Sequence, residues 1–136
     1  MKLTIEPLKT DTYDTILTKW WKDWGWTPPS KDFLPDDGKG GLIVYADDIP
    51  VCAGFIYITN SKLSCVDWIV SNKDFREKPY RKQAITMLID SLTNISKNLG
   101  NKYVYALIKH PSLIETYKSF GYAQGDSYTS EMIKVF

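Results

Sequence analysis

Three apolar, β-branched segments follow one another between residues 42 and 70, and no other feature of the sequence constrains the fold as strongly. The first two segments, 42–47 and 51–59, are joined by the turn residues 47–50 (DDIP). The turn 60–62 (NSK) then leads into the third segment, 63–70 (LSCVDWIV). Segments joined by such short turns pair as antiparallel neighbours. The sequence therefore predicts a strand meander at the centre of the fold.

Helical and extended patterns alternate on both sides of this meander. A helix is predicted from Asp11 to a stop at Gly25, and an amphipathic helix over 81–99, ended by Gly100. The remaining predicted elements are strands at 2–6, 103–108, 121–125 and 128–135, a short helix at 111–119, and a loop with at most one helical turn at 26–41. The order β-α-β-β-β-α-β-α-β-β predicts an α/β fold with a central mixed β-sheet flanked by helices.

Length and composition favour a single domain over residues 1–136 of a cytoplasmic protein. Seventeen basic and sixteen acidic residues give a net charge of +1, which offers no extended field for nucleic acid. The sequence shows no secretory signal, and no apolar run approaches the ~20 residues of a membrane span. Cys52 and Cys65 lie in apolar segments and are expected to be buried thiols in a reducing compartment. The sequence has only one histidine, and its two cysteines are separated, so it does not predict a Cys/His metal site.

The stretch 109–122 (KHPSLIETYKSFGY) directly follows the predicted strand at 103–108. Pro111 suits the first position of a helix, where its missing N–H would have no partner. Ser112 and Glu115 have the spacing of a capping box, and Gly121 suits the left-handed residue that ends a helix. These local signals explain the stretch as a strand, a cap, a short helix and a stop, without reference to any function.

The same stretch resembles the C-terminal motif of the GNAT N-acetyltransferase superfamily. In that motif a strand is followed by Asn, about two helical turns, Tyr, and then Gly-Phe. In this sequence His110, Tyr117 and Gly121 with Tyr122 stand at these positions. The order of elements over residues 1–136 resembles the superfamily as well. The resemblance implies an acyltransferase domain whose partners are acetyl-CoA, as cosubstrate, and an amine acceptor.

The resemblance also implies where acetyl-CoA would bind. Its pantetheine arm would lie between the strands 63–70 and 103–108, which diverge in the superfamily, and Tyr117 would protonate the departing thiolate. Ile69, Val70 and His110 are then expected to contact the cosubstrate. The structural alternatives are a tyrosine that only packs on the sheet and a histidine that only caps a helix.

The phosphate-binding turn of the superfamily, Gln/Arg-x-x-Gly-x-Gly/Ala, has a degenerate, glycine-free counterpart at 76–86 (REKPYRKQAIT). Two alignments are open, starting at Arg76 or at Arg81, and we favour the second because Ala84 and Thr86 are small. The residues of this turn expected to bind CoA are Arg76, Arg81, Lys82, Gln83, Ala84, Ile85 and Thr86. Clustered basic side chains at a helix N-terminus suit phosphate, and a solvated basic loop is the alternative.

Further candidates concern the acceptor. Asp67 is the only charged residue of the segment 63–70. It could act as the base that takes a proton from the amine, or it could satisfy a neighbouring backbone or tyrosine group. Trp26, Phe33 and Asp36 lie in the loop 26–41, where the resemblance places the acceptor surface.

Three functions follow from these observations. The first is an N-acetyltransferase that moves an acetyl group from acetyl-CoA to an amine of a small molecule or protein. The second is a GNAT-like fold without catalysis that acts as a binding or assembly module, which the glycine-free turn favours. The third is a sensor of an amine or nucleotide ligand. The sequence leaves the oligomeric state open, with a homodimer as one alternative.

Overall fold

The computed structural model describes residues 1–127 and 130–136, and its centre is a five-stranded sheet. The strands are β1 (Leu3–Pro7), β2 (Gly41–Ala46), β3 (Ile49–Ile58), β4 (Leu63–Ser71) and β5 (Tyr103–Tyr105). Their order in the sheet is the same as in the chain. β1 to β4 pair antiparallel, whereas β5 lies parallel to β4. The predicted meander and the mixed sheet are therefore confirmed.

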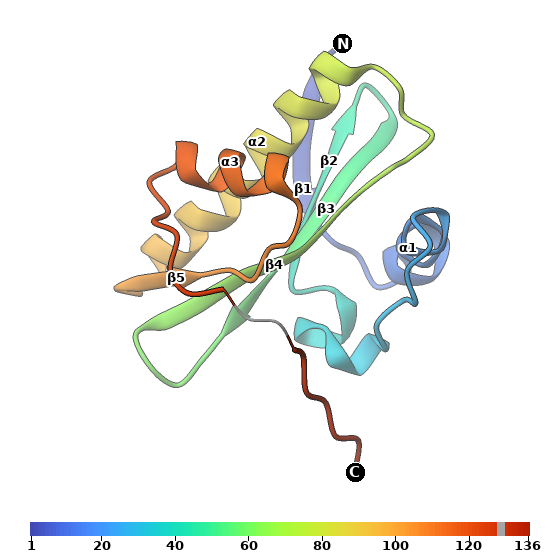
Figure 1. Cartoon of the computed structure of the whole chain (residues 1–136). Coiled ribbons are helices and arrows are strands. Elements are labelled where there is room, and N and C mark those ends of the chain that lie inside the picture. The colour runs from blue at the N-terminus through green and yellow to red at the C-terminus, as the bar shows by residue number, and fades with distance from the viewer. Residues whose placement is uncertain (128–129) are drawn as a thin grey trace.

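Helices lie on both faces of this sheet (Figure 1). On one face a π-helical turn, η1 (Tyr13–Leu17), continues into α1 (Thr18–Asp23). The loop that follows holds two 3-10 turns, η2 (Lys31–Phe33) and η3 (Pro35–Gly38), one more than the sequence predicts. On the other face lie α2 (Lys78–Asn98) and α3 (Pro111–Ser119). The bounds of α3 agree with the prediction at both ends.

Two hydrophobic clusters fix these helices to the sheet. Leu88 and Leu92 of α2 are fully buried against strand residues such as Val66. On the opposite face, Trp21 of α1 is fully buried beside Phe55 and in the same cluster as Val70. Burying one such side chain contributes roughly 1.5–3 kcal/mol. A helix that covers each face explains why β2 to β4 read as continuous apolar runs instead of alternating ones.

The C-terminal part of the chain differs from the prediction. β5 ends at Tyr105, three residues earlier than expected. The described residues after α3, 120–127 and 130–136, form no strand. The predicted strand at 121–125 is therefore wrong, and the predicted strand at 128–135 is wrong over residues 130–135. Residues 128–129 of this second strand lie outside the described residues. Strand-like composition is not sufficient for a strand, because the extended backbone also needs a hydrogen-bonding neighbour.

Among the described residues, no helix combines the length and the apolar composition needed to cross a membrane. Cys52 is buried and Cys65 half-buried, and both thiols are free. Over residues 1–127 and 130–136, no group of three or more His, Cys, Asp or Glu side chains is placed to hold a metal ion.

Candidate active site

The candidate site lies where β4 and β5 separate. The two strands pair only through Leu63 with Tyr103, Ser64 with Val104 and Cys65 with Tyr105. Beyond this point the chain after β5 no longer follows β4. The backbone N–H of Leu107 instead donates to a carboxylate oxygen of Asp67, at 3.3 Å. This side-chain contact replaces a strand–strand bond, which explains why β5 is shorter than predicted.

A β-bulge in β4 reorganises the same place. Asp67 is in register with Phe55 of β3 and Val70 with Ala53, so Trp68 and Ile69 together face Gly54 alone. Trp68 has a left-handed backbone, with φ of +57°. The extra residue reverses the alternation of side chains, so the Trp68 ring packs with the α1 cluster and Ile69 packs with the α2 cluster.

Gly54 is what makes room for this bulge. A Cβ atom on Gly54 would lie 2.5 Å from Cδ1 of Ile69 and 3.1 Å from Cδ1 of Leu92. A side chain at this position would force the end of the Ile69 side chain to move. Sequence analysis missed the bulge, and the glycine in the middle of an otherwise apolar strand was the one signal that could have revealed it.

Tyr117 reaches the separation point from the α2 side of the sheet. Its side chain is 2% exposed, and its hydroxyl donates to the carbonyl oxygen of Val66 at 2.9 Å. The Tyr122 ring packs edge-on against it, with centroids 4.9 Å apart, and the Tyr122 hydroxyl is hydrogen-bonded to Thr93 of α2 at 2.7 Å. Burial raises the pKa of Tyr117, and the nearby Asp67 charge raises it further. The phenol therefore keeps its proton throughout the neutral range.

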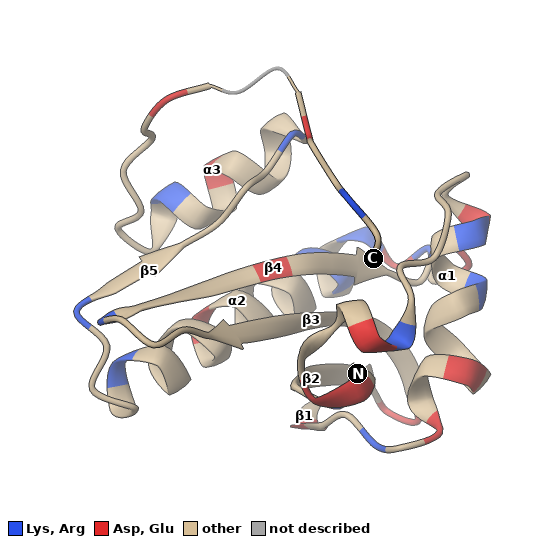
Figure 2. Cartoon of the chain, turned by 90° about the horizontal axis from the view of Figure 1, so that it is seen from below, with Lys and Arg blue, Asp and Glu red and all other residues tan. Residues whose placement is uncertain are grey.

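Asp67 follows Val66 directly and lies at the same point of β4, which carries one acidic segment in its middle (Figure 2). Burial raises the pKa of Asp67 to about 6, while hydrogen bonds from the backbone N–H groups of Leu107 and Trp68 lower it. At neutral pH the carboxylate is mostly charged, yet it accepts a proton at a modest cost. The structure therefore places the Tyr117 phenol and the Asp67 carboxyl near one another, although they come from elements far apart in the sequence.

The two alignments of the phosphate turn differ in their position relative to the start of α2. The helix begins at Lys78, with Glu77 as its N-cap residue and Pro79 in the first turn. Free backbone N–H groups occur only in the first turn of a helix. Ala84, Ile85 and Thr86 lie one turn deeper, and Ala84 is fully buried in the core. The alignment that starts at Arg76 therefore coincides with the helix N-terminus, and the favoured alignment that starts at Arg81 does not.

The basic side chains of this turn divide into two groups. The Arg81 guanidinium donates to the backbone carbonyls of Asn72, at 3.0 Å, and of Phe75. It therefore holds the turn between β4 and α2 in place. Arg76, Lys78 and Lys82 are exposed, and none of the hydrogen bonds or ion pairs among the described residues engages their charged groups.

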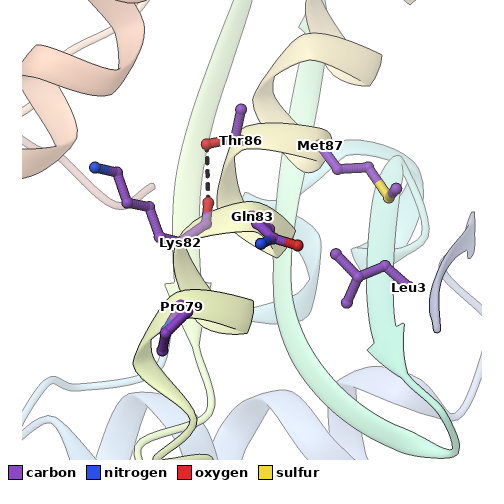
Figure 3. A pocket seen from close by; sticks show the side chains of 6 residues that line it. All are labelled: Leu3, Pro79, Lys82, Gln83, Thr86 and Met87. Carbon is purple, nitrogen blue, oxygen red and sulfur yellow. Dashed lines mark hydrogen bonds between the residues drawn. The ribbon is translucent and has the colours of Figure 1, made fainter. Parts of the chain in front are cut away.

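Gln83, Thr86 and Lys82 also line an open hollow of about 580 Å³ between β1 and the first half of α2. Figure 3 shows Gln83 and Met87 of α2 turned toward Leu3 of β1, while the Lys82 ammonium extends to the other side. Neither Tyr117 nor Asp67 lines this hollow. It is therefore separate from the point where β4 and β5 diverge.

His110 stands at the N-cap position of α3, but its side chain does not cap the helix. Its Nδ1 is hydrogen-bonded to the Ser112 hydroxyl at 2.7 Å. The capping box predicted from Ser112 and Glu115 is consequently absent, and Glu115 forms an ion pair with Lys118. Pro111 takes the first helical turn as predicted.

The residues expected to contact an acceptor lie on the α1 side of the sheet. Trp26 and Phe33 are 50% and 47% exposed, and the Phe33 ring packs edge-on against Trp68 at 5.9 Å. Asp36 is exposed at the following 3-10 turn, with φ of +50°. Phe33 thus adjoins β4 through Trp68, whereas Trp26 stacks on Trp24.

Comparison with known proteins identifies the fold. No protein-family model matches the sequence, and no curated protein matches it significantly. Glucosamine-6-phosphate N-acetyltransferase from Arabidopsis thaliana is similar in structure, with a TM-score of 0.69 and 12% identity over 98% of this chain and 100% of the other. An aminoglycoside acetyltransferase from an uncultured soil metagenomic sample gives 0.65 and 10% identity over 97% of both chains.

A third structure is AAC(6')-Iy, solved in complex with the bisubstrate analogue CoA-S-monomethyl-acetylneamine. Its TM-score is 0.63, with 14% identity over 99% of this chain and 100% of the other. Together these similarities show that the chain has the fold of the GNAT N-acetyltransferases. At such low identities the similarity concerns the fold and does not extend to a substrate.

Proposed function

We propose that residues 1–136 form an acetyl-CoA-dependent N-acetyltransferase domain. The observation that carries the proposal is that the Tyr117 hydroxyl, bonded to the Val66 carbonyl, and the carboxylate of the next residue, Asp67, both lie where β4 and β5 part. The GNAT neighbours, one of them bound to a CoA-containing analogue, support the same activity.

The residues present are compatible with acetyl-CoA, which would supply an acetyl group activated as a thioester. The gap between β4 and β5 would accept the pantetheine arm, with the backbone of Ile69 and Val70 on one side, since both side chains pack into the core. The N-terminus of α2 would take the phosphates through Arg76 and Lys78. Pro79 removes one backbone donor there, so side-chain charge would carry more of the binding than in a glycine-rich turn.

Asp67 and Tyr117 would then divide the proton transfers. The amine nitrogen loses a proton as its bond to the acetyl carbon forms, and Asp67 accepts it. The sulfur that leaves the acetyl carbon gains a proton from Tyr117. To donate in this way, the Tyr117 hydroxyl has to release the Val66 carbonyl.

The alternative is a GNAT-like binding module without catalysis. Pro79 in the first turn of α2 and the absence of glycine over 76–86 favour it, because both reduce the number of backbone N–H groups that can approach a phosphate. The two functions differ in whether acetyl-CoA binds at all.

Thermal unfolding with and without acetyl-CoA tests the proposal. A ligand at 100 times its Kd stabilises the native state by about 2.7 kcal/mol, which is measurable as a rise in Tm. The double variant Arg76→Ala, Lys78→Ala should lose most of this rise and show a weaker salt dependence of binding. Release of CoA thiol in the presence of amines then measures transfer.

The matched control is Lys62→Ala, Lys97→Ala, which removes the same charge from exposed sites outside the first turn of α2. It should keep the acetyl-CoA response of the wild type. No Tm response in the wild-type protein would reject the transferase and favour the binding module. If both double variants lose the same part of the acetyl-CoA-induced rise in Tm, the assignment of the phosphate site is rejected.

A further inference from the structure

The α1 side of β4 carries a row of aromatic side chains from three segments of the chain. The bulge turns the Trp68 ring to this side, where it lies edge-on to Trp21 at 6.2 Å and to Phe33 at 5.9 Å. Trp24 and Trp26 form a second pair near the end of β4, with stacked rings 6.3 Å apart and the Trp24 indole bonded to Ser71. A bulge that places a tryptophan beside Asp67 links this aromatic surface directly to the candidate base.

Hydrogen bonds anchor the segments that carry the exposed members of the row. The Phe33 carbonyl accepts a hydrogen bond from the Tyr57 hydroxyl at 3.1 Å, which ties η2 to β3. The Trp26 backbone N–H donates to the Trp21 carbonyl at 2.9 Å. The Trp24 indole N–H donates to the Ser71 carbonyl at 2.8 Å. Half-exposed rings that are ordered before binding lose little conformational entropy when a ligand packs on them.

Carboxylates lie near the Phe33 and Trp68 end of this surface, whereas at its other end the Lys73 ammonium lies 5.2 Å from the ring centre of Trp24. Asp67 lies next to Trp68 in the chain, and Asp32 and Asp36 are exposed on η2 and η3. The nearest cation on η2, Lys31, is 3.5 Å from the carboxylate of Asp14 and 5.8 Å from the Tyr13 ring centre, so its charge is engaged. Flat apolar rings beside carboxylates suit a ligand that combines a ring with an ammonium group.

We propose that the acceptor of this site is a small primary amine that carries an aromatic ring, with the ring on Phe33 and Trp68 and the nitrogen at Asp67. This inference rests on the proposed acetyl transfer for the reaction itself, but recognition of the ring does not require turnover. For the reaction the ammonium first gives one proton to water. The neutral amine nitrogen then bonds to the acetyl carbon, the carbon–sulfur bond breaks, a second proton passes from nitrogen to Asp67, and Tyr117 supplies one to sulfur; proton exchange with water restores both side chains.

Calorimetric binding of 2-phenylethylamine, n-butylamine and spermidine tests the recognition, and CoA release with the same amines tests the chemistry. We expect 2-phenylethylamine to bind roughly tenfold more tightly than butylamine, the scale of one aromatic or cation–π contact. Phe33→Leu, which keeps an apolar side chain on η2, should abolish most of that preference.

The control Tyr103→Leu removes an aromatic ring that is 60% exposed on β5 and should leave the preference unchanged. Equal binding of all three amines, or tighter binding of spermidine, overturns the inference even if acetyl transfer occurs. A ring preference that Phe33→Leu abolishes supports it even if no amine is acetylated, in which case only the proposed catalysis fails.

Discussion

Residues 1–98 and 99–136 contribute to the molecule in different ways. The first segment provides β1 to β4, α1 and α2, with a hydrophobic cluster on each face of the sheet. Among the described residues, Tyr117 is the only buried apolar side chain after Leu92. The segment that supplies the candidate acid therefore adds one buried side chain to the core, together with half-buried ones such as Val104 and Phe120. We infer that the first segment determines stability, whereas the second completes the site.

The largest effect that tests this comparison is expected for Trp21→Ala. Trp21 is fully buried against the rings of Tyr13, Phe55 and Trp68. Its indole N–H has no hydrogen-bond partner, so the loss would be one of packing. Removing a buried tryptophan costs about 3–5 kcal/mol of unfolding free energy. Urea denaturation at unchanged m-value measures it.

Tyr103→Ala is the control for this variant in the second segment, because the side chain is mostly exposed. Its unfolding free energy should change by no more than about 0.5 kcal/mol. Comparable losses in the two variants would contradict the division into a stabilising segment and a site-completing segment.

The next effect concerns Tyr117→Phe, which removes the hydroxyl and keeps the ring. We expect kcat for acetyl transfer to fall about 10²-fold, or about 2.7 kcal/mol in barrier height, because the departing sulfur loses its proton donor. Since the Val66 carbonyl also loses its hydrogen bond, unfolding should become about 1 kcal/mol easier. Steady-state kinetics and denaturation on the same preparation separate the two effects.

Tyr122→Phe is the matched control, because it removes the hydrogen bond to Thr93 from the ring that packs on Tyr117. It should lower stability by a similar amount and leave kcat within a fewfold of the wild type. If both variants reduce kcat equally, Tyr117 acts through packing and is not the acid.

The smallest effect is expected when residues 130–136 are deleted. All seven are exposed, so little apolar contact is lost and the unfolding free energy should change by less than about 0.5 kcal/mol. Ending the chain after Ser119 instead removes Tyr122. This deletion should lower the unfolding free energy more, because Tyr117 loses its packing partner. A large loss from the shorter deletion would show that the C-terminal segment contributes to the core.

The sequence predicted the elements whose signals are local. Pro111 and Gly121 bracket α3, and Gly100, with φ of +86°, follows α2 as expected. The meander followed from short turns between apolar segments. Such features depend on neighbours within a few residues, so a single sequence is sufficient to recognise them.

Features that depend on distant partners were missed. The bulge at Trp68 requires Gly54 on another strand, and the end of β5 depends on the Asp67 carboxylate that binds Leu107. α2 begins three residues before its predicted start, because Pro79 occupies the first helical turn instead of lying outside the helix. The roles of Tyr117 and Asp67 were suggested by the resemblance, and their placement at one point of the sheet required the structure.

The agreement between strand order and chain order has a consequence for how the chain folds. β2, β3 and β4 can assemble through hairpin contacts between consecutive strands, whereas β1 pairs with β2 across α1 and the 3-10 turns, and β5 can pair with β4 only after α2 has crossed the sheet. Non-local parallel pairing of this kind forms late. With only three paired residues, β5 and α3 form a natural unit of partial unfolding, so the candidate site would be complete only while this unit is docked on the sheet.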